Sequence, residues 1–131
     1  MDVYKVLLEY SIQLEVRIGE LGELLENSVK KRRKIYDDAV KPLNLMLRNY
    51  RKELGYKLNS FDKVTNADEV TLTENQQIAL DRYEHQLEIL TKEQDNAYSY
   101  EKKMGKSIEE LKVKLENHKE FIVHVFSLNV D

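Results

Sequence analysis

The chain of 131 residues has no cysteine, no tryptophan, one proline and four glycines. Without cysteine there are no disulfides, no thiolate zinc sites and no thiol nucleophile. Glycine and proline close turns and interrupt helices, so their scarcity argues against a sheet-rich or disordered chain. Charged residues make up 34% of the sequence, a share typical of long helices. We therefore expect an all-α protein.

The sequence also lacks long apolar runs and a strong charge of one sign. No stretch approaches the roughly 20 apolar residues that span a bilayer, and the opening Met-Asp-Val-Tyr-Lys has no basic region followed by an apolar run. The formal net charge is −3, so no overall positive field attracts phosphate. These features predict a soluble, cytoplasmic chain with no membrane partner.

The second half of the chain carries the clearest periodic signal. Alternating steps of three and four residues from Leu80 to Val125 meet mostly apolar or aromatic side chains. The polar exceptions on this path are Gln94, Glu101 and His118. Such a sustained repeat is typical of a coiled-coil helix. We expect this second arm to cover about residues 73–126, with a tail over residues 127–131.

Two overlapping pairs mark the start of the second arm. Thr73 with Gln76, and Thr71 with Glu74, have the spacing at which two side chains satisfy each other's backbone N–H groups. Either pair predicts a helix that starts near residue 73.

The first half carries the same repeat in two pieces of different phase. One piece comprises Val3, Leu7, Tyr10, Leu14, Leu21 and Leu24. The other comprises Tyr36, Val40, Leu43, Leu47, Tyr50, Leu54 and Phe61. A stutter between Leu25 and Tyr36 would absorb the change of phase. Pro42 removes one backbone hydrogen bond and crowds the preceding turn, so we expect the first arm to be kinked or broken near Ile35–Pro42.

The apolar repeat stops between Asp62 and Leu72, where Asn, Asp and Thr favour turns. We expect a first arm over about residues 3–61 and a loop over about residues 62–72, within a single helical domain over residues 1–131.

The two arms are close in length, which favours a long antiparallel two-helix hairpin (coiled coil) with adjacent chain ends. Folding about residue 67 would set Arg33 opposite Glu101 and Val40 opposite Gln94. Polar positions of one arm would then meet polar positions of the other.

Five cations in a row, from Lys30 to Lys34, form the sharpest local feature. Successive helical residues step by about 100°, so these side chains surround the helix axis. Acidic residues flank the run at i,i+4 spacing, as in Glu26 with Lys30 and Arg33 with Asp37. We favour a solvated, ion-paired section of helix. The alternative phosphate contacts are Lys30, Lys31, Arg32, Arg33, Lys34, Lys102 and Lys103, with Tyr36, Tyr98 and Tyr100 as candidates for base stacking.

The remaining polar residues form no recognisable reaction centre. His118 and His124 point about 240° apart around one helix, and so cannot clamp one ion. The four glycines make no phosphate-binding loop, and close approach of helices explains them better. We expect no catalytic, cofactor-binding or metal-binding residues, no cofactor, and a protein that is not an enzyme.

Apolar residues outside the repeat gather near the two chain ends. A two-helix hairpin buries only one stripe on each helix, so these side chains need another cover. The predicted partner-binding residues are Val6, Leu8, Ile12, Val16, Val113, Phe121, Val123 and Phe126. Leaving so many apolar side chains in water would forgo as much free energy as an ordinary domain has in stability. We therefore expect a homo-oligomer, such as a homodimer forming a four-helix bundle, or a bound protein partner.

These features favour a non-enzymatic protein–protein interaction protein, acting as an adaptor, inhibitor or assembly component through a self-associating helical hairpin. The alternative is a nucleic-acid-binding protein that uses the basic run. One local alternative also stays open, because the β-branched and aromatic residues of Phe121 to Val130 would suit a short strand as well as a helix.

Overall fold

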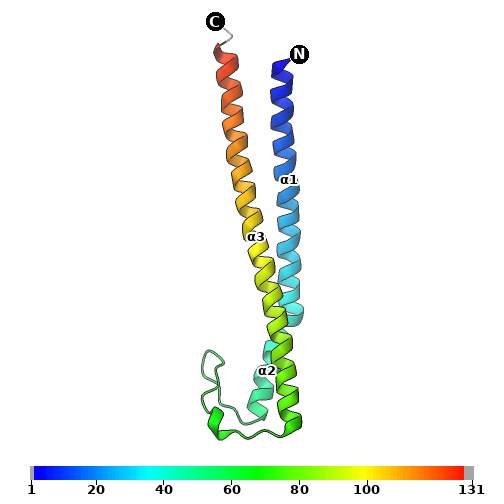
Figure 1. Ribbon diagram of the computed structural model, residues 1–131, viewed down its shortest axis with the longest axis vertical. Helices are drawn as coiled ribbons and strands as arrows, with labels where there is room; N and C mark the ends of the chain where they lie inside the picture. Colours follow the sequence, from blue (N-terminus) through cyan, green and yellow to red (C-terminus); the bar gives the residue numbers. More distant parts are fainter. Residues whose placement is uncertain (1, 129–131) are drawn as a thin grey trace. The chain divides into compact units, whose positions relative to one another are not determined.

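The computed structural model describes residues 2–128, and these residues form an all-α hairpin. Helix α1 spans Val3–Ile35, the π-helix η1 spans Tyr36–Val40, and α2 spans Lys41–Glu53. A 3-10 helix, η2, covers Ala67–Glu69, and α3 spans Glu74–Leu128. The two long helices α1 and α3 pack against each other (Figure 1). The predicted all-α fold and two-helix hairpin are confirmed.

The chain divides into two compact units. The terminal unit contains residues 2–30 and 98–128, and the loop unit contains residues 31–97. The single domain predicted over residues 1–131 stays a prediction.

In the terminal unit, α1 and the second half of α3 run antiparallel. The ring of Tyr4, near the start of α1, meets the ring of Phe126 edge-on at 4.7 Å, whereas Ser28 donates a hydrogen bond to Glu101 at 3.4 Å. The buried apolar side chains of this unit are Leu14, Met104 and Ile108. All three lie on the predicted repeat.

In the loop unit, the start of α3 packs on η1 and α2. The rings of Tyr50 and Tyr83 lie 5.4 Å apart, and Arg51 pairs with Glu84 at 3.1 Å. The buried apolar side chains of this unit are Val40, Leu47 and Leu80.

On α3, every position of the apolar repeat from Leu80 to Val125 is buried or half-buried. The repeat therefore predicts the buried face of this helix correctly. It fails at five positions of the first arm. The positions that were predicted to be buried and are exposed are Val3, Tyr10, Leu24, Tyr36 and Phe61. Leu25 and Ile35 are half-buried in place of Leu24 and Tyr36.

The predicted kink near Pro42 is confirmed, and it takes the form of a wide helical turn. The backbone N–H of Lys41 donates to the carbonyl oxygen of Tyr36, five residues earlier. Pro42 lies in the first turn of α2, where its missing N–H is tolerated. A π turn adds one residue to the helix, which shifts the phase of the apolar face without breaking the backbone hydrogen bonding. The change of phase therefore falls in η1 rather than in the stutter predicted before Tyr36.

The first arm ends earlier than its repeat predicted, at Glu53 instead of about residue 61. Gly55 has a φ of 97°, its N–H donates to the carbonyl of Lys52, and the N–H of Tyr56 donates to the carbonyl of Arg51. This pair of hydrogen bonds is the Schellman motif that ends many helices, and it needs a left-handed residue at the Gly55 position. The predicted loop over residues 62–72 is therefore too short.

The second arm begins where the first of the two capping pairs predicted. Thr73 accepts a hydrogen bond from the N–H of Gln76 at 3.2 Å, and the Gln76 side chain accepts one from the N–H of Thr73 at 2.9 Å. At its other end, α3 continues as far as Leu128, through most of the segment that was predicted to suit either a strand or a helix. The helical alternative is therefore correct for the described part of that segment. Positions 129–131 of the predicted tail lie outside the described residues.

The predicted pairing register holds for some facing pairs, such as Glu15 and Lys119, and not for others. Tyr50 and Tyr83 fit it, whereas Glu101 bonds to Ser28 and Gln94 donates to the carbonyl of Arg32 at 3.2 Å. The position predicted for Val40, opposite Gln94, is therefore wrong, whereas the pairing of Arg33 with Glu101 stays a prediction. A fold about one central residue gives every facing pair the same sum of residue numbers, and the observed pairs do not share one sum.

Candidate functional site

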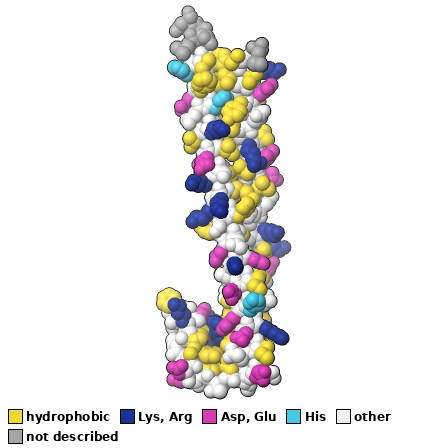
Figure 2. All heavy atoms as spheres, in the orientation of Figure 1, with side chains coloured by type: hydrophobic (Ala, Val, Ile, Leu, Met, Phe, Trp, Pro, Cys, Tyr) yellow, Lys and Arg dark blue, Asp and Glu magenta, His cyan; other side chains and the backbone are white. Residues whose placement is uncertain are grey.

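The predicted partner-binding residues all lie in the terminal unit, and most are exposed. Side chains from α1 and α3 contribute, at the end of the unit where α1 begins and α3 ends (Figure 1). The exposed members are Val6, Leu8, Ile12, Val16, Val113, Phe121 and Val123, and Phe126 is half-buried. Figure 2 shows hydrophobic side chains gathered at this end.

One side of the helix pair, here called the Ile12 flank, comprises Tyr4, Leu8, Ile12, Val16 and Val123. The four residues of α1 recur every four positions, a spacing that turns about 40° per step, so the row starts beside α3 at Tyr4 and reaches the outer face of α1 at Val16. Two contacts between the helices place Val123 on the same side, because Glu15 pairs with Lys119 at 3.3 Å and Tyr4 packs on Phe126. Val123 lies between Lys119 and Phe126 on α3. The Ile12 flank is therefore an exposed apolar surface of α1 that Val123 of α3 extends.

The opposite side, here called the Tyr10 flank, comprises Val6, Tyr10, His118 and Phe121. The Tyr10 ring meets the His118 imidazole edge-on at 4.7 Å, and the Lys114 ammonium lies 5.8 Å from the ring centre. Val6 precedes Tyr10 by four residues and Phe121 follows His118 by three, which places both on this side. The Tyr10 flank is smaller and more polar than the Ile12 flank.

Val113 belongs to neither flank. It lies two residues from Leu111 and from Leu115, both half-buried, so its side chain points away from α1. The structure thus separates the predicted set into two flanks and one outlying residue. It also adds two exposed aromatics that the prediction left out, Tyr4 and Tyr10. The spacing of Tyr4 before Leu8 and Ile12 was a usable signal, because a row at i,i+4 continues along one helix face.

The basic run lies on α1, as the sequence predicted. Lys30, Lys31, Arg33 and Lys34 are exposed, and Lys30 pairs with Glu26 at 3.3 Å. The other candidate phosphate contacts lie on α3, where the Lys102 ammonium sits 5.4 Å from the centre of the Tyr98 ring. Lys103 shares a shallow groove with Arg17, Leu21 and Tyr100.

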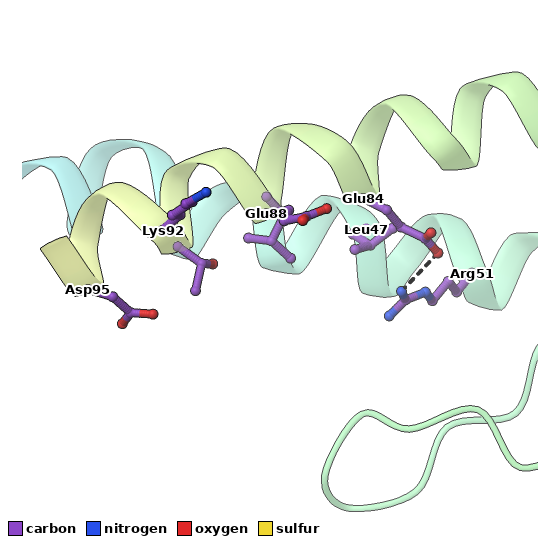
Figure 3. A pocket seen from close by; sticks show the side chains of 8 residues that line it. Leu47, Arg51, Glu84, Glu88, Lys92 and Asp95 are labelled. Carbon is purple, nitrogen blue, oxygen red and sulfur yellow. Dashed lines mark hydrogen bonds and ion pairs between the residues drawn. The ribbon is translucent and has the colours of Figure 1, made fainter.

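A further groove of the loop unit is lined by side chains of α2 and α3 (Figure 3). Its apolar part is formed by Leu47 and Leu87, and its rim carries Glu88, Lys92 and Asp95. The Arg51–Glu84 pair closes one end at 3.1 Å. The rim mixes both signs of charge around a small apolar floor, an arrangement suited to weak contact with a polar surface.

The histidines have separate environments. The imidazole Nε2 of His118 lies 2.9 Å from the carbonyl oxygen of Leu7, whereas His85 and His124 are exposed. Within residues 2–128, no three side chains of the His, Cys, Asp and Glu types are grouped to hold a metal ion. None of the helices in the same range combines the length and apolar content needed to cross a bilayer.

Comparison of the chain with protein-family models, with curated proteins and with solved structures finds no match.

Proposed function

We propose that this chain is a non-enzymatic interaction protein, an adaptor, inhibitor or assembly component that self-associates through the Ile12 flank. The observation that supports the proposal is the exposure of this apolar surface on α1, which Val123 of α3 extends. Ile12, at its centre, is 57% exposed although it belongs to one of the most strongly buried residue types.

The free energy available from covering the surface is large. Full burial of one aliphatic or aromatic side chain contributes about 1.5–3 kcal/mol, so the five residues of the Ile12 flank, which are between 37% and 66% exposed, would contribute on the order of 4–8 kcal/mol. That amount is comparable to the total stability of an ordinary domain. A cover over this surface therefore stabilises the fold as well as the complex.

A second copy of the chain is the cover that fits the Ile12 flank best. Two hairpins that pack these flanks together form a four-helix bundle, in which each helix turns an apolar stripe toward the centre. The coiled-coil repeat of α3 already supplies one stripe, and the Tyr4–Leu8–Ile12–Val16 row supplies the next. The Tyr10 flank stays at the surface of such a dimer, where it is available to a protein partner.

The test compares the oligomeric state of the wild-type chain with that of Leu8→Glu and Ile12→Glu, by light scattering coupled to size-exclusion chromatography. We expect a dimer for the wild type and monomers for both variants, because a buried unpaired carboxylate at the contact is costly. Ile89→Glu is the matched control, since Ile89 is exposed on α3 in the loop unit.

Circular dichroism must show unchanged helix content for each variant. A monomeric wild type, or variants that dimerise as the wild type does, would rule out the proposed contact.

The second candidate function is phosphate or nucleic-acid binding through the basic run. Its support is the exposure of Lys31, Arg33 and Lys34 and the placement of Lys102 over an exposed tyrosine ring. Binding to duplex and single-stranded DNA and RNA, measured from about 50 mM salt upward, should fall steeply with salt if phosphates are contacted. Lack of binding at the lowest salt would remove this candidate.

A further inference from the structure

The segment between α2 and α3 contains a small ordered β-hairpin. Leu58 and Val64 pair as an antiparallel bridge, and the N–H of Asn59 donates to the carbonyl of Lys63 at 2.9 Å. The N–H of Asp62 donates to the carbonyl of Asn59 at 3.0 Å, and Asp62 has a φ of 58°. A tight turn followed by one left-handed residue is a common way to close a hairpin with three loop residues, and Asp accepts that conformation better than most residues.

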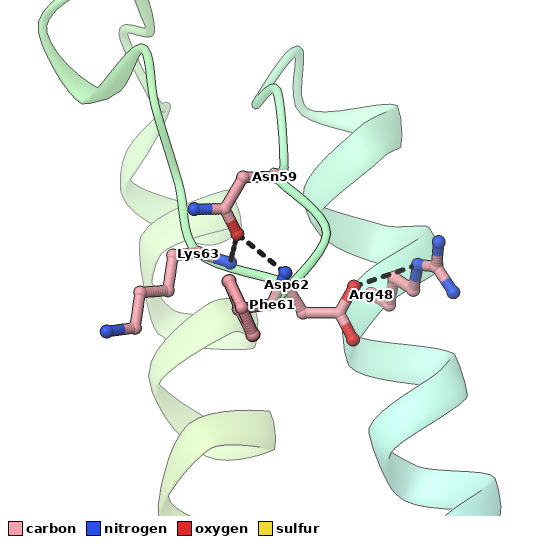
Figure 4. A network of polar contacts seen from close by, with 5 residues as sticks. All are labelled: Arg48, Asn59, Phe61, Asp62 and Lys63. Atoms are coloured by element: carbon pink, nitrogen blue, oxygen red, sulfur yellow. Dashed lines mark hydrogen bonds and ion pairs between the residues drawn. The ribbon is translucent and has the colours of Figure 1, made fainter.

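Two asparagines hold this hairpin at its tip and at its base. The side-chain oxygen of Asn59 accepts hydrogen bonds from the N–H groups of Phe61 at 2.8 Å and Lys63 at 3.0 Å (Figure 4). At the base, Asn66 accepts from the N–H of Lys57 at 2.7 Å and donates to the carbonyl of Gly55 at 3.1 Å. The tip is therefore preorganised by bonds that do not involve the apolar core.

The tip presents Phe61 to solvent. At 81% it is the most exposed large apolar side chain within residues 2–127. Beside the tip, the outer face of α2 forms a groove lined by Lys41, Pro42, Asn44, Leu45, Arg48 and Asp62. The Arg48 guanidinium binds Asp62 at 3.2 Å and so links the hairpin to α2 (Figure 4).

The length of this connection indicates a role beyond joining two helices. Residues 54–73 separate α2 from α3, whereas antiparallel helices are usually joined by a few residues. Ordered connections of this length are mostly functional. The hairpin is already ordered in the free protein. Binding of a ligand to it therefore costs little further conformational entropy of the protein.

The charge of this region differs in sign from that of the rest of the chain. From Lys41 to Thr65 there are six basic and two acidic residues, a local net charge of +4, although the whole chain carries −3. One of the two acidic residues, Asp62, is paired with Arg48. Lys41 lines the groove, and Lys52, Lys57 and Lys63 are exposed in the same stretch of the chain.

We propose that Phe61 and the adjoining groove of α2 form a docking site for an acidic segment of another protein that carries an apolar side chain. Phe61 and Leu45 would contact the apolar side chain, and the surrounding lysines would attract the acidic residues. An exposed aromatic on a rigid support next to an apolar hollow is the usual form of an interface anchor. This site is independent of the self-association proposed for the terminal unit.

A random twelve-residue peptide library displayed on phage and selected on the immobilised full-length chain tests the site. We expect enriched peptides to combine Asp or Glu with Leu, Phe, Tyr or Trp, and to be retained when the library is first depleted on a Phe61→Ser variant. Fluorescence anisotropy with a labelled enriched peptide should show binding about tenfold weaker for Phe61→Ser and for Lys41→Glu.

Leu24→Ser and Lys112→Glu are the matched controls, because both side chains are exposed in the terminal unit. Their binding should equal that of the wild type. Circular dichroism verifies the fold, which is expected to tolerate Phe61→Ser because the side chain has little core contact. Lack of enrichment, enrichment of basic peptides, or equal binding by Phe61→Ser would overturn the proposal.

The same variants distinguish two other ligands of the Phe61 site, a second copy of the chain and a nucleic acid. If Phe61→Ser converts a dimer to a monomer in light scattering, the surface binds a second copy of the chain and the proposal is wrong. If single-stranded poly(dT) displaces the labelled peptide with a steep salt dependence, the site binds phosphates instead of an acidic protein segment.

Discussion

His118 of α3 and Leu7 of α1 are joined across the terminal unit, with the imidazole Nε2 at 2.9 Å from the Leu7 carbonyl oxygen. The same ring meets Tyr10 edge-on at 4.7 Å. His118 is a polar exception on the apolar repeat of the second arm, and the contact explains how the interface accommodates it. The imidazole of His118 forms a hydrogen bond with the backbone carbonyl of Leu7, and its ring also packs against the ring of Tyr10.

His118→Ala should therefore lower the free energy of unfolding by about 1–3 kcal/mol, because it removes one hydrogen bond and one aromatic contact. Urea unfolding followed by circular dichroism measures the change, at one fixed protein concentration because oligomers are stabilised by mass action. His124→Ala is the matched control, since His124 is exposed. Equal stability of the two variants would contradict the role given to His118.

The glycines of the hairpin provide a second test, because they occupy two different backbone environments. A methyl group at Gly19, Gly22 or Gly105 would meet no atom within 4 Å, so the close helix approach predicted for these positions is wrong. Gly19→Ala and Gly22→Ala should each raise the free energy of unfolding by about 0.5–1 kcal/mol, through the higher helix propensity of alanine.

Gly55→Ala is the contrasting variant. At a φ of 97° an alanine is strained, and we expect a loss of about 1–2 kcal/mol in the same unfolding experiment. If all three substitutions changed stability in the same direction, the left-handed end of α2 would not be the reason for Gly55.

The predictable part of this fold is the part set by helix periodicity. On α3 the repeat finds every inward position from Leu80 to Val125, because one uninterrupted helix keeps its phase over its whole length. The capping pair of Thr73 and Gln76 also follows from local sequence, since both partners lie within one turn.

The parts that escaped prediction are those where two signals compete. Leu54, Leu58 and Phe61 continue the apolar spacing of the first arm, but Gly55 ends the helix with a left-handed residue. The turn-forming residues Asn59, Ser60 and Asp62 agree with that ending. Reading these residues together with Gly55 would have placed Phe61 in a loop.

The form of the distortion near Pro42 was beyond reach for a different reason. A π turn inserts a single residue, and neither Tyr36 nor Val40 reveals from sequence alone which turn carries it. Pro42 locates the distortion to within a few residues but does not fix its form. Candidate interaction residues were predictable only as apolar positions off the repeat; their division into two flanks required the contacts of Tyr4 and Tyr10.

The start of α3 offers a third test. Thr73→Ala should lower the free energy of unfolding by about 1 kcal/mol, because it leaves the N–H of Gln76 without its acceptor. Thr71→Ala is the control from the alternative capping pair, and we expect it to leave stability unchanged. A larger loss for Thr71→Ala would place the helix start two residues earlier than the structure does.

Leu47 and Leu45 make the fourth test, as two leucines of α2 with opposite environments. Leu47 is 2% exposed and Leu45 is 56% exposed. Leu47→Ala should lower the free energy of unfolding by about 2–4 kcal/mol, because it removes buried methyl groups and leaves a cavity beside α3. Leu45→Ala should change it by less than about 0.5 kcal/mol, as expected for a surface position.

Because the Leu45 side chain lines the groove next to Phe61, its loss should instead weaken binding of the enriched acidic peptides. A variant that keeps full stability and loses peptide binding separates the docking role of α2 from its structural role. A Leu45→Ala chain that binds as tightly as the wild type would confine the contact to the hairpin tip.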